Sequence, residues 1–311
     1  MKLVHYQLKD ATGESRIGWI EESKVYDLQE SFRLYALSQR KFTDADNVEA
    51  LLPANPTTFF KGGCEMIARA KEAYTYVLKE HKDVVFAYDR TDVILKTPIP
   101  EPQKVICVGR NYKEHAEEMK GEIPEIPVLF SKFPNALIGP EDNIHKSKQT
   151  DKLDYEVELT IVIGKEASQV KQEDAYDYIA GYTIGNDTTA RDIQKRTLQW
   201  LQGKTMDHTS PFGPWVVLKE DIPAPDQLEV RTFVNDELRQ QSNTNKLIFD
   251  IPFLIEFISG LITLQPGDMI MTGTPEGVGA GMNPPTFLED GDIVRLEIDQ
   301  IGSLVNTVVQ K

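Results

Sequence analysis

Hydrophobic and polar residues alternate along much of this chain, and the alternation predicts a protein with more strands than helices. Near the N-terminus, residues 2–9 and 16–29 alternate in this way and predict short strands. Residues 57–81 instead repeat their apolar positions at helical spacing, with glycines near the start. The first part of the chain is therefore expected to combine a few strands with a long helix.

A proline-rich stretch divides the chain into two parts. The sequence "LKTPIPEPQK" carries three prolines, which interrupt regular structure, so we take residues 96–103 as a linker. This division predicts an N-terminal accessory domain over residues 1–95 and a second domain over residues 104–311. No group of residues with catalytic potential stands out before the linker.

Beyond the linker, strand patterns outnumber helical ones and do not alternate with them as βαβ units would. The strand-like segments are 104–109, 127–133, 153–165, 178–189, 214–218, 228–236, 267–275 and 292–310. Helical spacing is found over 110–121, over 190–204 for about three turns, and over 248–262. The predicted fold class is α+β and rich in β-structure.

One predicted strand, "DYEVELTIVIG" at residues 154–164, carries an unusual face. Side chains alternate along a strand, so Asp154, Glu156 and Glu158 share one side while apolar residues form the other. Acidic residues are depleted in strands, and like charges on one face repel each other. A positive group is therefore expected in front of these carboxylates.

A hard divalent cation would satisfy this requirement. Glu156 and Glu158 can converge on one ion, and Asp187 supplies a third acid where a strand ends and a helix begins. Oxygen ligands with no histidine or cysteine beside them favour Mg²⁺ or Mn²⁺. The alternative is a solvated acidic strand face, with Asp187 as a helix N-cap. Asp154 lies nearer the strand end and is expected to be solvated.

A histidine and a glutamate lie one helical turn apart in "GRNYKEHAEEM". On a helix His115 and Glu118 are neighbours, and a carboxylate beside an imidazole orients the ring and raises its basicity. Such a pair can act as a general base near neutral pH. The preceding "GRN", which includes Arg110, is a flexible segment that would let the helix act as a lid. The alternative is a surface helix with a chance His–Glu neighbour.

Basic and amide side chains form a third group of candidates, namely Lys132, Arg191, Gln194 and Lys204. Beside a carboxylate cluster, a lysine would offset the negative charge and hold a substrate carboxylate. The alternative is that these groups only solubilise the surface.

The glycine-rich segment "TGTPEGVGAG" at residues 272–281 lacks the Gly-Lys-Ser/Thr ending of a phosphate-binding loop. Its glycines and Thr274 are expected instead to let backbone groups approach a small ligand closely. Cys107 and His115 would form an alternative nucleophile pair. Cys107, however, lies in the apolar segment "VICVG" and is expected to be buried and structural.

The charge of the chain narrows the range of partners. Its 311 residues include 49 acidic and 34 basic ones, which gives a formal net charge of −15. This balance argues against nucleic acid and membrane surfaces as partners, because both bind basic patches. Two cysteines do not provide a disulfide framework, and the N-terminus shows no apolar signal segment. A cytoplasmic protein is therefore expected.

Six segments, read in order, resemble the fumarylacetoacetate hydrolase family over about residues 103–310. They are "GRNYKEHAEE", "PVLFSK", "DYEVELTIVIG", "YTIGNDTTARDIQ", "KTMDHTSPFGPWVV" and "MTGTPEGVG". The first hundred residues match only loosely, as the variable N-terminal domain of some members. The resemblance implies a mixed β-roll domain, usually dimeric, with a divalent ion held by Glu156, Glu158 and Asp187.

The same resemblance implies roles for the other candidates. It places His115 and Glu118 as a catalytic pair on a mobile lid, with Lys204 beside the metal. Substrate contacts are expected from the remaining polar motif positions, Arg110, Lys132, Arg191, Gln194 and Thr274.

One departure from the family pattern bears on the substrate. The founding enzyme, which acts in tyrosine breakdown, has an additional metal-binding aspartate upstream of its catalytic histidine, whereas "VICVGRNY" contains no acid. The chain is more similar to the branch that acts on acylpyruvates and oxaloacetate. We therefore expect metal-dependent C–C bond cleavage in a small 2-oxo acid, by oxaloacetate decarboxylation or acylpyruvate hydrolysis. The substrate would chelate the Mg²⁺ or Mn²⁺ ion.

Other functions stay open at this point. Related folds isomerise or hydrate dienoic diacids such as 2-hydroxyhepta-2,4-diene-1,7-dioate, and tautomerisation of oxaloacetate is a further variant. Outside catalysis, the chain would be an interaction protein that keeps the family scaffold and docks a protein partner on its N-terminal domain. The expected partners are otherwise a small 2-oxo acid and a second copy of the chain in a homodimer.

Overall fold

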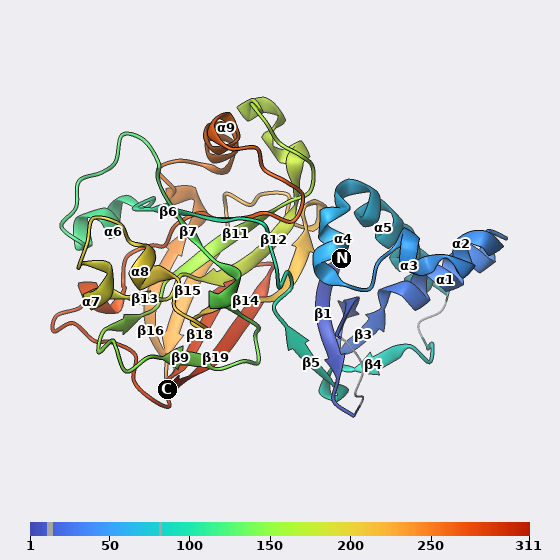
Figure 1. Ribbon diagram of the computed structural model, residues 1–311, viewed down its shortest axis with the longest axis horizontal. Helices are drawn as coiled ribbons and strands as arrows, with labels where there is room; N and C mark the ends of the chain where they lie inside the picture. The colour runs from blue at the N-terminus through green and yellow to red at the C-terminus, as the bar shows by residue number, and fades with distance from the viewer. Residues whose placement is uncertain (11–14, 81–82) are drawn as a thin grey trace.

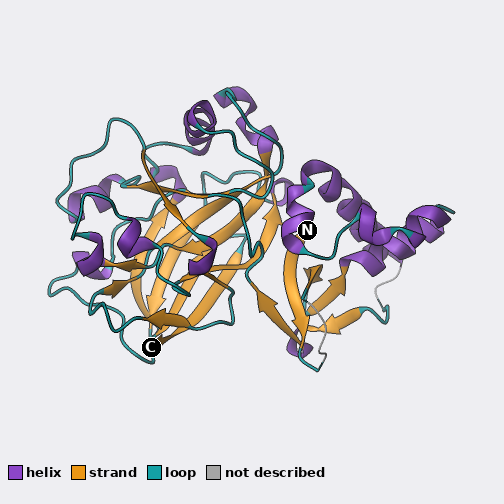
Figure 2. Ribbon diagram, viewed as in Figure 1, coloured by secondary structure: helices purple, strands orange, loops and turns teal. Residues whose placement is uncertain are grey.

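The computed structural model describes residues 1–10, 15–80 and 83–311 and shows an α+β protein rich in strands (Figure 1; Figure 2). The predicted fold class is confirmed. In Figure 1 an N-terminal lobe, blue, lies beside a larger lobe built around strands. Within the described part of the chain, no helix is long and apolar enough to cross a membrane.

The N-terminal lobe packs helices against a small antiparallel sheet. Its strands are β1 (Lys2–Leu8), β2 (Arg16–Glu21), β3 (Lys24–Asp27), β4 (Ala87–Asp89) and β5 (Val93–Lys96). Its helices are α1 (Leu28–Ser38), α2 (Phe42–Asp46), α3 (Val48–Leu51), α4 (Pro56–Lys61) and α5 (Gly63–Glu80). Trp19 of β2 is fully buried and stacks on Tyr26 of β3, with 3.9 Å between the ring centroids, so aromatic packing joins these strands.

Two features of this lobe differ from the sequence prediction. Helix α1 was not predicted; it begins because the Asp27 side chain accepts a hydrogen bond from the backbone N–H of Glu30 at 2.9 Å. The single helix predicted over residues 57–81 is broken into α4 and α5, and residue 81 lies outside the described residues. The second helix begins at Gly63, whose φ is +59° and where a Cβ would lie 2.6 Å from the carbonyl oxygen of Gly164.

The larger lobe contains the main part of a twelve-stranded sheet. Ten of its strands run in the order β4-β3-β2-β1-β14-β12-β11-β17-β6-β7, while β5 pairs with β1 and β8 with β14. The N-terminal strands therefore extend the sheet through the pairing of β1 with β14. Its strands in this lobe are β6 (Val105–Gly109), β7 (Val128–Lys132), β8 (Leu137–Ile138), β11 (Val157–Ile163), β12 (Ile179–Asn186), β14 (Ser210–Leu218) and β17 (Met269–Met271). The predicted linker 96–103 begins at the last residue of β5 and ends before β6, and the domain division stays a prediction.

A five-stranded sheet packs against this one and closes the main core. It has the order β16-β15-β18-β19-β9, and its strands are β9 (Ile144–Lys146), β15 (Glu229–Val234), β16 (Glu237–Asn243), β18 (Ile293–Ile298) and β19 (Gly302–Gln310). Val157, Leu159 and Ile161 of β11 enter that core together with Val230 and Leu296. The apolar face predicted for β11 is therefore a core face.

Short elements complete the larger lobe. They are β10 (Leu153–Asp154), β13 (Thr189–Ala190), α6 (Lys113–Glu118), α7 (Arg191–Gln194), α8 (Leu201–Lys204) and α9 (Ile251–Leu261). Figure 1 shows α6, α7 and α8 gathered on the side of this lobe away from the N-terminal one.

The three-turn helix predicted over residues 190–204 is wrong. The segment forms two single turns, α7 and α8, separated by a loop. A Cβ at Gly203 would lie 2.6 Å from the backbone nitrogen of Gln194, so the glycine lets α8 fold back onto α7. A continuous helix rising about 1.5 Å per residue would have separated Arg191 from Lys204 by roughly 20 Å. The break instead brings both side chains to the same carboxylate, that of Glu156.

Candidate active site

Three buried carboxylates meet where strand β11 begins and strand β12 ends. The antiparallel pairing of Val157 with Asn186 places Glu156 beside Asp187, and the backbone N–H of Asp187 donates to the Glu156 carbonyl at 2.9 Å. Glu158 follows two residues later on the same face. One oxygen from each of Glu156, Glu158 and Asp187 lies within 4.8 Å of the others. The structure thus brings together the three predicted metal ligands.

Buried cations surround two of these carboxylates. The Nζ atom of Lys204 lies 2.6 Å from both Glu156 and Asp187, and that of Lys132 lies 2.9 Å from Asp187. Arg191 donates from Nη2 to Glu156 at 2.6 Å. These three cations were predicted as substrate or catalytic groups beside the cluster, and in the structure they bind its carboxylates.

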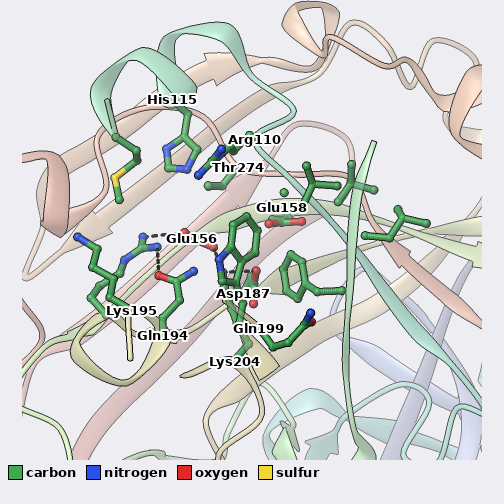
Figure 3. Close-up of a pocket in the computed structure, with 18 of the residues that line it drawn as sticks. Arg110, His115, Glu156, Glu158, Asp187, Gln194, Lys195, Gln199, Lys204 and Thr274 are labelled. Carbon is green, nitrogen blue, oxygen red and sulfur yellow. Dashed lines mark hydrogen bonds and ion pairs between the residues drawn. The ribbon is translucent and has the colours of Figure 1, made fainter. Parts of the chain in front are cut away.

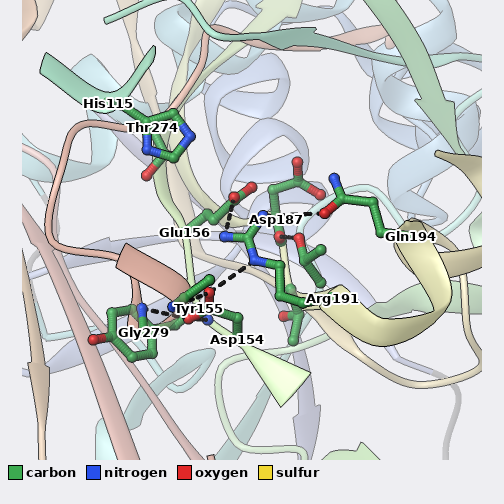
Figure 4. A network of polar contacts seen from close by, with 12 residues as sticks. His115, Asp154, Tyr155, Glu156, Asp187, Arg191, Gln194, Thr274 and Gly279 are labelled. Carbon is green, nitrogen blue, oxygen red and sulfur yellow. Dashed lines mark hydrogen bonds and ion pairs between the residues drawn. The ribbon is translucent and has the colours of Figure 1, made fainter. Parts of the chain in front are cut away.

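The expectation that Asp154 is solvated is wrong. Its side chain is fully buried, and it accepts hydrogen bonds from the backbone N–H groups of Gly279 at 2.7 Å and Ala280 at 3.0 Å. It also accepts one from Arg191 Nε at 2.8 Å (Figure 4). Asp154 therefore belongs to the ionic network of the site rather than to the surface.

The network divides the carboxylates into one that is readily ionised and one that is not. Burial alone would raise the pKa of Glu156, but the charges of Lys204 and Arg191 hold it well below its ordinary value. Burial raises the pKa of Glu158 well above its ordinary value, and repulsion from Asp187 and Glu156 adds to this effect.

The donor set fits a hard divalent cation. Among the described residues, no lysine or arginine forms an ion pair with Glu158, whose Oε2 accepts one hydrogen bond from the backbone of Gly273 at 2.7 Å. When all are ionised, the four buried acids and three buried cations leave one negative charge; they are Asp154, Glu156, Glu158, Asp187, Lys132, Arg191 and Lys204. A buried cluster of oxygen ligands with excess negative charge is suited to Mg²⁺ or Mn²⁺.

The predicted His–Glu pair lies on α6 and faces this cluster across a cavity. His115 is 6% exposed, and its Nδ1 is 3.6 Å from Oε2 of Glu118 and has no hydrogen-bond partner. Glu118 accepts hydrogen bonds from the backbone N–H of Gly277 at 3.0 and 3.2 Å. In this arrangement Glu118 is held by the glycine-rich loop and can stabilise a positive charge on the histidine.

The cavity has a volume of about 590 Å³ and collects most of the predicted site residues (Figure 3). Nine of them line it, namely Arg110, His115, Glu156, Glu158, Asp187, Arg191, Gln194, Lys204 and Thr274. Glu118 and Lys132 lie behind it and act on lining residues. A cavity of this size suits a small ligand.

Three residues that the sequence analysis did not single out hold the cavity wall in place. The side chain of Asn111 donates to the carbonyls of Phe249 and Thr272 at 3.0 and 2.8 Å, which fixes the chain just before α6. Gln240 accepts from the backbone N–H of Val157 and donates to Thr274 Oγ1. These contacts join residues 34 to 161 positions apart, so the local pattern carries no signal for them.

Trp200 is the third such residue, and it shapes the mouth of the cavity. A Cβ at Gly109 would lie 2.4 Å from the Trp200 ring, so the glycine makes room for the indole. The guanidinium of Arg110 lies over the same ring at 5.6 Å from its centroid. Trp200 therefore restrains Arg110 at the mouth of the cavity.

Cys107 is fully buried, as expected from its apolar segment. Burial, with the nearby charge of Asp187, raises the pKa of its thiol well above the ordinary value. Its sulfur lies 3.7 Å from that of Met271. This environment disfavours the thiolate, so Cys107 is unsuited to act as a nucleophile with His115.

Comparison with known proteins places the chain among related enzymes. The profile of the family described as "Fumarylacetoacetate (FAA) hydrolase C-terminal" matches residues 104–309. The protein of Bacillus subtilis named oxaloacetate tautomerase YisK is 41% identical over 311 residues, which cover 97% of this chain and 100% of that relative. The similarity therefore includes the N-terminal lobe as well as the site.

Two solved structures are similar to the whole chain. The fumarylacetoacetate hydrolase of the psychrophile Exiguobacterium antarcticum has a TM-score of 0.80 at 34% identity and covers 100% of both chains. The maleylpyruvate hydrolase of Sphingobium sp. SYK-6, solved in complex with manganese(II) and pyruvate, has a TM-score of 0.76 at 29% identity. It covers 100% of this chain and 99% of that one.

Proposed function

The chain belongs to the fumarylacetoacetate hydrolase family, and we propose that it is a metal-dependent tautomerase that interconverts the keto and enol forms of oxaloacetate. One observation carries the proposal: a buried three-carboxylate cluster and a histidine–glutamate pair line or support the same small cavity. The name of the full-length relative supports tautomerisation over the C–C cleavage that the sequence pattern favoured.

The carboxylate cluster is suited to activate a 2-oxo acid. A Mg²⁺ or Mn²⁺ ion held by Glu156, Glu158 and Asp187 would supply Lewis acidity that stabilises negative charge on the 2-oxo oxygen. Lys204 donates hydrogen bonds to both Glu156 and Asp187 and so orients those two carboxylates.

His115 is suited to move the proton. In the keto-to-enol direction its imidazole accepts a proton from C3 of the substrate, and the pair of electrons left behind forms the C2–C3 double bond. The imidazolium is stabilised by Glu118, whose Oε2 is 3.6 Å from Nδ1. Return of this proton from His115 to the 2-oxo oxygen completes the enol and restores the neutral imidazole, so the reaction is a proton shift with no bond broken in the carbon chain.

The charges that line the cavity favour a dicarboxylic substrate. Lys132, Arg191 and Lys204 are all bound by protein carboxylates. Among the described residues that line the cavity, Arg110 and Lys195 form no ion pair, and Trp200 restrains Arg110. We infer that Arg110 binds the carboxylate of oxaloacetate that is remote from the 2-oxo group, because a guanidinium matches a carboxylate in geometry and charge.

Decarboxylation or hydrolysis of a 2-oxo acid is the second candidate. It would start from the same polarised 2-oxo group, and a similar solved structure is a maleylpyruvate hydrolase with pyruvate bound. In this reaction the C3–C4 bond breaks, and pyruvate is released. Release of pyruvate therefore distinguishes cleavage from tautomerisation.

One experiment separates these reactions. The ultraviolet absorbance of enol oxaloacetate is followed by stopped flow with and without Mg²⁺, while pyruvate is measured in parallel. We expect loss of enol absorbance that needs the metal and yields no pyruvate beyond the uncatalysed rate. Metal-dependent pyruvate release at the same rate would establish cleavage instead, and no acceleration of either process would contradict both candidates.

Three further expectations remain predictions of the same kind. A homodimer and a cytoplasmic location follow from the family resemblance and the sequence. A protein partner on the N-terminal lobe would be a role in addition to catalysis. Each of these is independent of the chemistry proposed for the cavity.

A further inference from the structure

Asp154 lies at a junction between three parts of the active site. Its Oδ1 accepts a hydrogen bond from the backbone N–H of Gly279 at 2.7 Å. Its Oδ2 accepts from the N–H of Ala280 at 3.0 Å and from Arg191 Nε at 2.8 Å (Figure 4). Both oxygens are therefore occupied by donors from chain segments far apart in sequence.

Arg191 extends this junction to the carboxylate cluster. The same guanidinium that binds Asp154 through Nε binds Glu156 through Nη2 at 2.6 Å. Both carboxylates and the arginine are buried, so these charge-assisted hydrogen bonds are shielded from water. The charge of Arg191 is therefore shared between two acids.

The glycine-rich loop, residues 272–281, extends the junction to the lid. Its Gly277 donates a backbone hydrogen bond to Glu118, the partner of His115. A Cβ at Gly281 would lie 2.2 Å from the Glu118 carboxyl carbon, so the loop fits closely around this side chain. Only one residue, Val278, separates the loop nitrogen that binds Glu118 from the one that binds Asp154.

We propose that Asp154 is a positioning residue that fixes Glu156 through Arg191 and fixes the His115–Glu118 pair through the glycine-rich loop. The inference deepens the metal-dependent function proposed above and rests on it. Asp154 touches neither the cavity nor a reacting atom, and it acts only through these neighbours.

Replacement of Asp154 by asparagine tests the link through Arg191 and the link through the glycine-rich loop, because it changes the shape of the side chain very little. One oxygen can still accept from Gly279, but the amide nitrogen cannot accept from Ala280 or Arg191. Arg191 then has Glu156 as its remaining carboxylate partner. The Glu156 oxygen that it binds, Oε1, becomes harder for a cation to bind. We expect the Mn²⁺ affinity of Asp154→Asn to fall about 10–100-fold, the usual effect of losing a group that orients a metal ligand.

The control and the rescue variant use the same region of the chain. Asp192 also accepts hydrogen bonds, from Thr150 Oγ1 at 2.6 Å and from the N–H of Asp151, but it does not face the cluster. Asp192→Asn is expected to keep the Mn²⁺ affinity of the wild type. The double variant Asp154→Asn/Arg191→Gln also removes the arginine that would then bind Glu156 as its one carboxylate, and it is expected to regain about tenfold in affinity over Asp154→Asn.

The full-length variants are compared by electron paramagnetic resonance, which counts free Mn²⁺, and by hydrogen exchange of the metal-free proteins. Asp154→Asn should exchange faster over residues 113–119 and 277–281, and Asp192→Asn should not. The exchange readout needs no metal, so it tests this inference even if the wild type binds no Mn²⁺ and the proposed function fails.

Two results would overturn the inference. One is unchanged exchange over the lid and loop in Asp154→Asn. The other is a double variant that binds Mn²⁺ no better than Asp154→Asn although the wild type binds it. Should Asp154→Asn fail to fold, exchange in the double variant decides, because that variant removes Arg191 together with one of its two carboxylate partners.

Discussion

The two halves of this active site are held in place by different kinds of contact. The carboxylate half lies on paired strands β11 and β12, and buried cations bind Glu156 and Asp187 at 2.6–2.9 Å. The other half, called the lid half after the role predicted for it, is the six-residue helix α6, in which His115 Nδ1 has no hydrogen bond and Glu118 is held by one backbone N–H. One half is fixed by many ionic contacts, and the other by few.

This difference indicates that the two halves have different roles in the site. Carboxylates that must hold a cation benefit from being oriented before the cation arrives, because no binding energy is then used to arrange them. A lid must open to admit substrate, and segments with few buried contacts open at low free energy. We therefore expect variants of the carboxylate half to lose metal binding and variants of the lid half to lose proton transfer alone.

Glu158→Gln should have the largest effect, because it removes a predicted metal ligand. Loss of several kcal/mol of charge stabilisation corresponds to a fall in turnover of about 10³-fold or more. The same change removes repulsion from Asp187 and Glu156, so the metal-free protein should be at least as stable as the wild type. Turnover, Mn²⁺ titration and thermal unfolding measure the three effects.

The matched control for Glu158→Gln is Glu166→Gln, at an exposed position whose side chain accepts from Gln265. This control should keep both turnover and metal affinity. A Glu158→Gln protein with wild-type turnover after chelation and metal addition would remove Glu158 from the metal site.

His115→Gln should break the lid half and leave the carboxylate half intact. Turnover is expected to fall by about 10²–10⁴-fold, the usual contribution of a general base. Mn²⁺ affinity should stay within twofold of the wild type, because His115 donates to none of the three carboxylates in the structure. Glu117→Gln, an exposed change on the same helix, serves as the control. A parallel loss of metal affinity would show that the two halves are not separable.

The sequence predicted the parts of each half that depend on local periodicity. Glu156 and Glu158 were predicted to share a face because side chains alternate along a strand, and they do. His115 and Glu118 were predicted to be neighbours from helical spacing, and they lie 3.6 Å apart on α6. Period and spacing act within a few residues, so such features follow from a short stretch of chain.

The features that the sequence did not predict depend on long-range contacts. Asp154 was expected to be solvated because its neighbours in sequence give no cation, whereas its partner Arg191 lies 37 positions away and Gly279 lies 125 away. The break of the helix at 190–204 likewise depends on how α8 packs against α7 through Gly203. The prediction used local helical spacing alone, and that spacing carries no information about these long-range contacts.

The roles of the cations show the same limit. The family resemblance placed Lys204 beside the metal and predicted Lys132 as a substrate contact. Their bonds to Asp187 and Glu156 show that the cluster itself uses their charge. The number of acids that converge at a site decides which cations are left for a substrate, and this number is known only from the fold.

Arg110→Gln should weaken substrate binding, because Arg110 is proposed to bind the carboxylate of oxaloacetate that is remote from the 2-oxo group. A hydrogen bond to a charged group contributes about 1.5–3 kcal/mol, so KM for oxaloacetate should rise roughly 10–100-fold. KM for a 2-oxo acid with an uncharged tail should change little. Lys195→Gln, the other cation without an ion pair in the cavity, is the control. Equal effects on both substrates would indicate that Arg110 only shapes the cavity.

The smallest expected effect is a pH dependence of metal binding confined to the carboxylate half. Because the pKa of Glu158 is raised in the metal-free protein, a proton leaves when the cation binds at pH values below that raised pKa. Affinity for Mg²⁺ should therefore rise with pH by at most tenfold per unit, and become constant above the raised pKa. Calorimetry in two buffers of different ionisation enthalpy measures the proton released.

The pH dependence of the stability of the metal-free protein provides an independent check on the directions of these pKa shifts. A carboxyl whose pKa is raised on folding stabilises the fold most at low pH, and the contribution is lost as pH rises through the raised value. Glu156, whose pKa is lowered, acts in the opposite sense: its contribution is present above the ordinary glutamate pKa and is lost on acidification. Glu158→Gln should abolish only the first effect. Metal binding without proton release would mean that Glu158 is already ionised, and that the three buried cations balance the cluster more completely than the contacts indicate.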